Sequence, residues 1–159
     1  MCLINQMVKS LILVKHAPGA PGLRLFGIGS NYQPMNGIEK LKNLFDKNAF
    51  WARKRSVNNL KIMLSHSDVI RSIWINKNII AFGRATTDRC FRATLWDVVV
   101  DQDFQTLGLG KLIVESILEN SLIANAEKVY LMTTNCTNFY ESLNFKKETK
   151  QTLMFYKGL

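Results

Sequence analysis

The residues with the clearest chemical meaning form a short glycine-bearing loop. Gln105-Thr106-Leu107-Gly108-Leu109-Gly110 follows an apolar, β-favouring run at 93–100 and precedes an amphipathic segment at 111–118. Gly108 and Gly110 have no Cβ, so a ligand can approach the backbone closely there. The first N–H groups of a helix are unpaired and lie at the positive end of its dipole. This order of strand, loop and helix start therefore indicates a site for phosphate groups.

The loop matches neither of the two commonest phosphate-binding motifs. No G-x-x-x-x-G-K-[ST] pattern ends at Lys111, and G-x-G-x-x-G is absent. Its pattern is Q-x-x-G-x-G, with Trp96-Asp97-Val98-Val99-Val100-Asp101 before it and Asn138-Phe139-Tyr140-Glu141 after it. This combination resembles the GNAT superfamily of N-acetyltransferases. The resemblance covers about Met35 to Tyr156 and is strongest to the plastid and cyanobacterial branch, whose preceding strand end is similar to Phe82-Gly83-Arg84-Ala85-Thr86-Thr87-Asp88.

The resemblance implies an enzyme that moves an acetyl group from acetyl-CoA to a primary amine by direct attack in a ternary complex. It places the arm of acetyl-CoA along the central strand and the pyrophosphate in the loop. Many relatives have Gly at the position of Thr106. The residues that the resemblance implies for acetyl-CoA binding are Val98, Val99, Val100, Gln105, Thr106, Leu107, Gly108, Leu109, Gly110, Lys111 and Asn138.

Two side chains are candidates for proton transfer. A lysine-like amine is neutral only about once in 2,500 molecules at neutral pH, so a base, or a water chain that ends on one, assists its attack. Asp97 interrupts the apolar strand and is the candidate base; the alternative is a structural carboxylate paired with a neighbour such as Arg84 or Arg92. Tyr140, which the resemblance places beside the CoA sulfur, is the candidate acid; the alternative is an ordinary core aromatic residue.

The sequence leaves the acceptor amine open. The resemblance implies protein lysines and N-termini, or arylalkylamines such as serotonin. Phe50, Trp51 and Trp74 could line a cleft for an aromatic amine, although each of these residue types is often found in a core. The alternative to an enzyme is a non-catalytic acetyl-CoA-binding sensor or interaction protein, and the presence of both Asp97 and Tyr140 argues against it.

The composition fits a globular protein of a reducing compartment. Its 159 residues, 47% of them apolar, are enough for a sizeable core. Three widely spaced cysteines and two histidines indicate neither a disulfide framework nor a metal site. The net charge of +9 fits solubility and an anionic cosubstrate, and no motif indicates specific nucleic-acid binding.

The sequence also gives expectations about location and assembly. No apolar run reaches the roughly 20 residues that span a bilayer, so we expect no membrane partner. The N-terminus lacks the composition of a signal or transit peptide. We therefore expect a plastid protein if the gene is algal and plastid-encoded, a cytoplasmic one otherwise, and a monomer or homodimer.

The order of the elements predicts an α/β (α+β) fold with a mixed, mostly antiparallel sheet flanked by about four helices, which agrees with the GNAT fold. We expect a flexible N-terminal arm at 1–24 and a single domain at 25–159. The expected helices are 36–46, 56–65, the segment after the glycine loop and 135–143, ending at Asn144; the expected strands are 25–28, 69–75, 79–86, 93–100, 129–133, 145–148 and 152–156.

Overall fold

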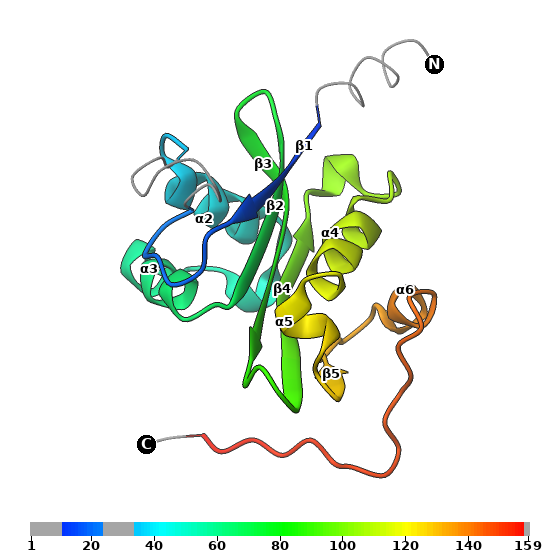
Figure 1. Cartoon of the computed structure of the whole chain (residues 1–159). Helices are drawn as coiled ribbons and strands as arrows, with labels where there is room; N and C mark the ends of the chain where they lie inside the picture. The colour runs from blue at the N-terminus through cyan, green and yellow to red at the C-terminus, as the bar shows by residue number, and fades with distance from the viewer. Residues whose placement is uncertain (1–10, 24–33, 158–159) are drawn as a thin grey trace.

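The computed structural model describes residues 11–23 and 34–157 (Figure 1). The elements in chain order are β1 (Ile12–His16), α2 (Gly37–Asn48), the 3-10 turn η1 (Phe50–Ala52), α3 (Val57–Ser65), β2 (Val69–Ile75), β3 (Asn78–Thr87), β4 (Arg92–Val100), the 3-10 turn η2 (Gln102–Phe104), α4 (Leu109–Leu118), α5 (Ser121–Ala124), β5 (Lys128–Tyr130) and α6 (Thr137–Glu141).

The strands form one sheet in the order β1-β2-β3-β4-β5. The first four pair antiparallel with their neighbours, and β5 pairs parallel with β4. The parallel step requires a crossover, which α4 and α5 supply. This arrangement confirms the predicted mixed, mostly antiparallel sheet.

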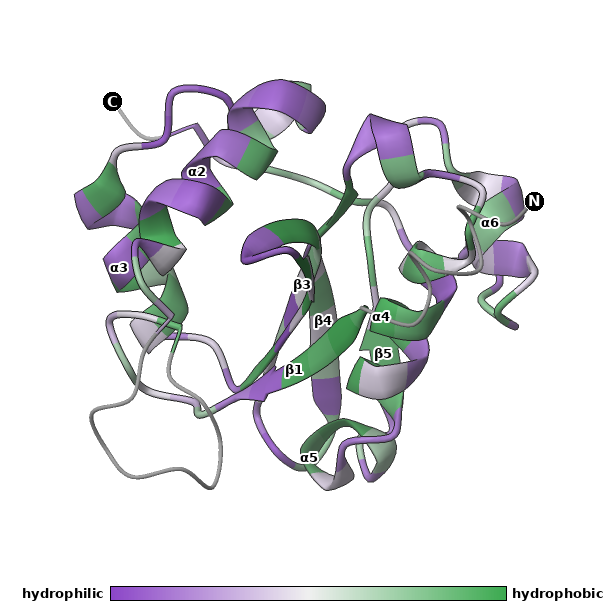
Figure 2. Ribbon diagram, turned by 90° about the horizontal axis from the view of Figure 1, so that it is seen from above, coloured by the Kyte–Doolittle hydropathy of each residue, from purple (hydrophilic) through white to green (hydrophobic). Residues whose placement is uncertain are grey.

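Helices cover both faces of the sheet, and each face has its own core. In Figures 1 and 2, α2 and α3 lie on one side of the strands, and α4 and α5 lie on the other. Phe45 and Leu60 pack against Phe82 on the first side. Ile113 and Ile117 of α4 pack in the cluster on the second side. The sheet is therefore buried on both faces, which explains why β2 is apolar along most of its length.

Local sequence signals account for several boundaries. Asn76 and Lys77 join β2 to β3 with φ of 46° and 65°, as a tight hairpin turn requires. The Ser56 side chain accepts a hydrogen bond from Asn59 N at 3.1 Å and caps α3. Asn144 has a φ of 66° just after α6, which confirms the predicted left-handed stop. No helix in the described ranges is long and apolar enough to cross a membrane.

The N-terminal region differs from the expectation of a flexible arm. Ile12–His16 forms β1 and pairs with Ile70–Trp74 of β2. The His16 ring nitrogen Nε2 lies 2.6 Å from Ser72 Oγ across this pair. The segment forms a strand because the edge of β2 offers its backbone hydrogen-bond partners, and the sequence alone does not indicate this pairing. The strand expected at 25–28 lies outside the described residues.

The two strands expected at the C-terminus do not form. Phe145–Glu148 and Thr152–Tyr156 have no strand structure, and this segment leaves α6 and runs past the ends of the strands (Figure 1). Leu153 and Phe155 are 72% and 89% exposed. The strand prediction was wrong because alternation predicts a strand only where an edge is available to pair with it, and here the segment is not docked on one.

Candidate functional site

The predicted phosphate loop leads directly into α4. Thr106 and Gly108 have φ of 69° and 75°, so the backbone turns through two left-handed residues before the helix. The first bond of the helix runs from Leu112 N to Gly108 O at 3.0 Å. The N–H groups of the preceding turn, at 109–111, therefore have no helical partner. Successive unpaired N–H groups around such a turn form a concave anion site.

The C-terminal half of β4 has a free edge beside this loop. The pairing of β4 with β5 ends at Thr94 and Tyr130. Asp101 N donates to Ile80 O at 2.8 Å, on the β3 side. By alternation, the backbone of Val100 faces the opposite edge, where Gln105 Nε2 lies 3.4 Å from Val100 O. The half-buried β4 segment is thus open to an added extended chain.

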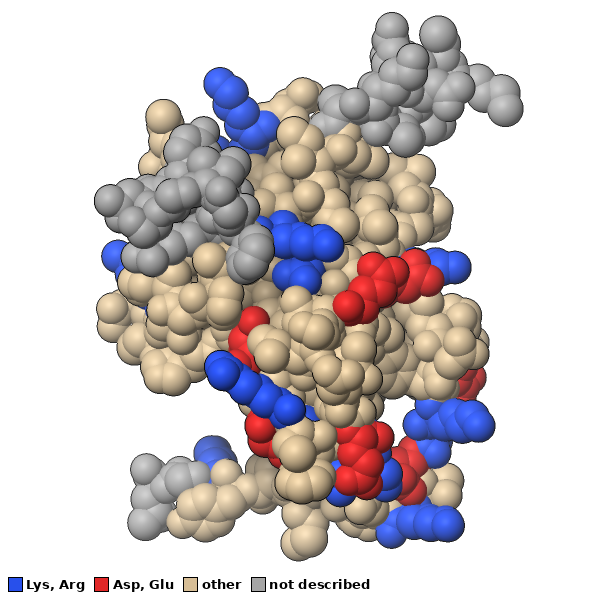
Figure 3. Space-filling model, viewed as in Figure 1, with Lys and Arg blue, Asp and Glu red and all other residues tan. Residues whose placement is uncertain are grey.

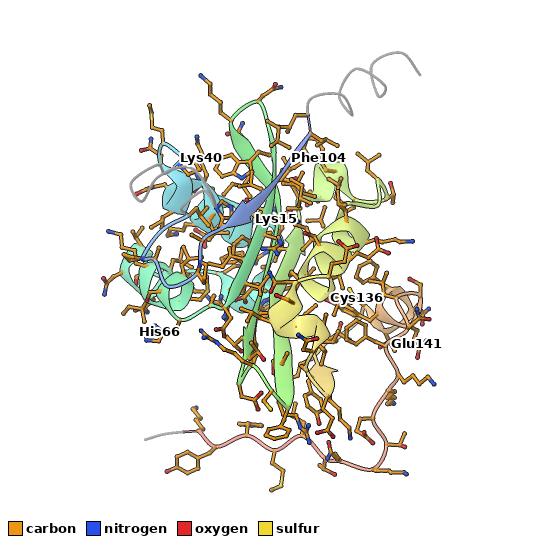
Figure 4. The ribbon with its side chains drawn as sticks, viewed as in Figure 1. Lys15, Lys40, His66, Phe104, Cys136 and Glu141 are labelled. Carbon is orange, nitrogen blue, oxygen red and sulfur yellow. The ribbon has the colours of Figure 1, made fainter. Side chains whose placement is uncertain are left out.

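Helix α6 lies beside the start of α4. A Cβ built on Gly110 would lie 3.3 Å from Cζ of Phe139, so α6 lies against the start of α4. Phe139 packs edge-on against Tyr140, with ring centroids 4.9 Å apart. Burial, with a contribution from nearby Cys136, raises the pKa of Tyr140 to about 12. In Figure 4, Cys136 and Glu141 mark the two ends of α6.

Asp97 lies at a bulge and carries two ion pairs. Between Phe82 and Arg84 the register of β3 against β4 shifts, and Asp97 has a φ of 53°. Its carboxylate accepts from Arg84 Nε at 2.8 Å and from Arg55 Nη1 at 3.0 Å. Its side chain is only 5% exposed. The bulge therefore turns a carboxylate out of β4 and toward α3.

The structure brings some of the predicted site residues together and separates others. The loop, the edge of β4 and Tyr140 meet around Phe139, which the sequence analysis did not assign to the site. The Asp97 carboxylate lies on the α3 side, where Arg55 also contacts Met63.

The remaining predicted residues occupy varied environments. Asn138 is exposed on α6. Lys111 lies 3.7 Å from Glu115, in the first turns of α4. Trp74 is buried, with its Nε1 donating to Ser72 Oγ.

Arg55 is a site residue that sequence reasoning missed. It precedes α3 in a basic run and is 42 positions from Asp97 in the chain, so no local pattern links the two. Arg92, one of the partners considered for Asp97, pairs with Glu127 instead. Within the described residues, no group of three or more His, Cys, Asp or Glu side chains could hold a metal ion.

Comparisons with known proteins place this mixed sheet, with its glycine-bearing loop beside the central strand, in the class of acetyltransferases. Residues 69–147 match the acetyltransferase (GNAT) domain. The N-acetyltransferase ycf52 of Porphyra purpurea is 37% identical over 125 residues, which is 75% of this chain and 70% of that protein. The chloroplastic GCN5-related N-acetyltransferase 1 of Arabidopsis thaliana is 31% identical over 113 residues, which is 68% of this chain and 55% of that protein.

Solved structures agree with this assignment at the level of the fold. A GNAT-family acetyltransferase of Streptococcus pneumoniae superposes with a TM-score of 0.69 at 19% identity, covering 93% of this chain and 98% of that one. The chain therefore belongs to the GNAT family of N-acetyltransferases. The family, the fold and the enzyme class predicted from the sequence are confirmed.

Proposed function

We propose that this acetyltransferase moves an acetyl group from acetyl-CoA to a primary amine by direct attack in a ternary complex. One observation carries the proposal: the free edge of β4 ends beside a loop whose left-handed residues precede unpaired helix N–H groups. This arrangement suits an extended polar arm joined to phosphates. When bound, acetyl-CoA supplies an activated acyl thioester.

The chain's own groups fit acetyl-CoA. A Cβ at Gly108 would meet nothing within 4 Å, so the loop is open toward a ligand. The backbone of Val98–Val100 binds the arm as an added strand would, and an N–H of this segment donates to the thioester oxygen. The residues that we propose to hold the pyrophosphate are Gln105, Thr106, Leu107, Gly108, Leu109, Gly110 and Lys111, with Asn138 contacting the arm.

Tyr140 is the proposed acid. Because burial raises its pKa to about 12, the phenol keeps its proton throughout the physiological pH range. A neutral phenol donates a hydrogen bond toward the departing sulfur, whose thiol analogue in Cys has a pKa of about 8.5. The ring is held by Phe139 and Phe145, so the hydroxyl has a defined position.

For Asp97, the contacts support the structural one of the two predicted roles. Both carboxylate oxygens accept from guanidinium groups. With a side chain that is 5% exposed, Asp97 offers an amine little access. We propose that its ion pairs hold the β4 bulge, and hence the N–H groups of Val98–Val100, in place.

We propose an arylalkylamine as the acceptor. Phe50 and Trp51 of η1 are 60% and 50% exposed and stack edge-on, with centroids 5.0 Å apart. η1 lies between α2 and α3 in the chain and is followed by Arg55, which contacts the Asp97 carboxylate of β4. The exposed Arg53 and Lys54, which follow η1, repel a peptide with several positive charges more strongly than an amine with one. Since relatives include chloroplastic proteins, we also propose that the enzyme works in a plastid.

The test is thiol release from acetyl-CoA by the purified protein with serotonin, tryptamine, spermidine, and lysine and N-terminal peptides. We expect release with the aromatic amines and a loss of 10²–10⁴-fold in kcat in Tyr140→Phe. Acetyl-CoA affinity, measured by calorimetry, should stay unchanged. Tyr156→Phe is the matched control, since Tyr156 is exposed on the C-terminal segment.

Other outcomes point elsewhere. Binding of acetyl-CoA without release to any amine would favour the non-catalytic sensor. Release with peptides alone would overturn the acceptor proposal and leave the transferase intact. Absence of acetyl-CoA binding would overturn the proposed site.

A further inference from the structure

Arg71 of β2 is a buried cation whose protein contacts are all neutral. It is 4% exposed. Its Nε donates to Ser116 Oγ at 3.0 Å and to Ser116 O at 3.2 Å, and its Nη1 donates to Ile70 O at 3.0 Å. A guanidinium has five N–H donors, so these bonds leave donors unused. Nη2 has no partner within the described ranges.

No carboxylate side chain forms an ion pair with this charge. Residues 1–10, 24–33 and 158–159 contain no Asp or Glu, so all 12 acidic residues of the chain are described. None of them lies within 4.0 Å of the Arg71 guanidinium. Asp68, which lines the same cavity as Arg71, accepts instead from Thr87 N and Arg89 Nη2. Burial without a counter-charge lowers the pKa of Arg71 and is costly.

A second cation faces the first. Lys15 of β1 is the cross-strand partner of Arg71, and like charges in this position are destabilising. In Figure 4, Lys15 lies at the middle of the view, where Figure 3 shows basic side chains gathered. The carbonyl end of α4, which Arg71 contacts, offsets only about half a charge.

These groups line a cavity of about 200 Å³. Its wall also contains Asn120 and Ser121, at the start of α5, which add an amide and a hydroxyl group. One water molecule occupies roughly 30 Å³ of liquid volume, so the cavity has room for a small polyatomic anion. Asp68 also lines the cavity, but its carboxylate accepts from Thr87 N and Arg89 Nη2, so Lys15 and Arg71 leave an excess of positive charge that suits an anion.

We propose that this cavity is a binding site for a phosphate group, either as free phosphate or as a phosphomonoester. A phosphate carries about −1.5 to −2 charges at neutral pH and has several acceptor oxygens. It therefore matches Arg71 and Lys15 together, whereas one carboxylate would neutralise one of them. Arg is suited to phosphate because its planar fork can donate in parallel.

The cavity is separate from the proposed acetyl-CoA site. Ser116 is seven residues beyond Leu109, so the cavity lies roughly 10 Å along α4 from the phosphate loop. An anion at Arg71 would contact the opposite end of the helix from the one proposed to bind pyrophosphate. Occupancy can therefore be measured while CoA fills the loop.

The experiment is calorimetric titration of inorganic phosphate into the protein in saturating CoA, at constant ionic strength set with sodium chloride. Glucose 6-phosphate and citrate are titrated in parallel. We expect phosphate or the monoester to bind, Lys15→Gln to weaken the affinity about tenfold, and Arg71→Met to abolish binding. Lys61→Gln, an exposed lysine of α3 on the other face of the sheet, is the control and should bind as wild type does.

The comparison of Lys15→Gln with wild type tests the proposal even if Arg71→Met does not fold. Lys15 is exposed, so its replacement leaves the core unchanged. Stronger binding of the monoester than of free phosphate would identify a metabolite site, and the reverse would identify a phosphate site. Equal phosphate affinity in Lys15→Gln and wild type would overturn the proposal. Citrate binding in preference to both phosphates, or no binding at about 10 mM phosphate, would overturn it as well.

Discussion

A Cβ built on Gly83 of β3 would lie 2.5 Å from Cγ2 of Ile113 in α4. Real Cβ atoms do not approach another carbon this closely, so α4 packs against bare backbone at this point. Gly83 also faces the bulge that contains Asp97. Helix α4, which begins at the glycine-bearing loop, and Val98 of β4 thus both lie against this one glycine of β3.

Gly83→Ala should destabilise the protein by about 2 kcal/mol, because overpacking a filled core forces side chains or backbone to shift. Urea unfolding measures the change. Gly37→Ala is the control: its Cβ would have ordinary contacts of 3.5–3.7 Å, so we expect no loss of stability. Equal effects of the two substitutions would show that Gly83 is not a close-approach site.

Stability should depend on pH through Tyr140. Its pKa is about 12 in the folded protein, against 10.0 for an unperturbed tyrosine. The unfolded state then loses its proton first, so the contribution is complete below about pH 10 and is lost as the pH rises toward 12. Between pH 9 and 11, we expect wild type to lose about 1 kcal/mol more than Tyr140→Phe in urea unfolding. Parallel losses would mean that Tyr140 titrates normally.

Asp97→Asn separates the two roles of this residue. It leaves two guanidinium groups without their shared partner, so we expect a loss of about 3 kcal/mol in the free energy of unfolding. Asp103→Asn, which removes an exposed pair with Lys47, should cost less than about 1 kcal/mol. If Asp97 is structural, the rate of Asp97→Asn still falls at low pH as the wild-type rate does. Loss of this fall at low pH, with a folded and CoA-binding variant, would identify Asp97 as the base.

Thr106 is a β-branched residue with a φ of 69°. A non-glycine residue in the left-handed region destabilises the folded state by roughly 1–2 kcal/mol, and glycine removes most of this strain. Glycine also adds conformational entropy to the unfolded chain, which costs about 0.5–1 kcal/mol of stability. Thr106→Gly should therefore raise the melting temperature by about 2 °C in calorimetry. Thr106→Ala keeps its Cβ and should give little gain. A lower melting temperature in Thr106→Gly would contradict the strain argument.

The C-terminal segment should be the first site of proteolysis. Between Lys146 and Lys157, the described residues form only one hydrogen bond, from Lys150 N to Glu148 Oε1 at 2.6 Å. Brief trypsin digestion should cut there while the sheet and helices stay intact, as read by mass spectrometry. Protection of this segment in the free protein would show that it is docked on a surface in solution.

Much of the local structure could be predicted from the sequence. The expected helix 56–65 begins at Ser56, which caps α3, and the gap between the expected strands 69–75 and 79–86 contains the hairpin turn. The Q-x-x-G-x-G pattern marked the start of α4. These signals succeed because backbone sterics and hydrogen bonds within a few residues decide them. The same patterns, with Tyr140 at its expected place on a short helix, were also enough to identify the family.

Only the tertiary structure decided which distant residues meet. The pairing of Arg55 with Asp97 and the contact of Phe139 with Gly110 join segments that no sequence spacing relates. Ile12–His16 pairs with the edge of β2, whereas the C-terminal segment, in which the sequence predicted two strands, has no strand structure. Strand pairing and ion pairing depend on which edges and faces the packed elements leave available, and that information arises only when the chain has folded.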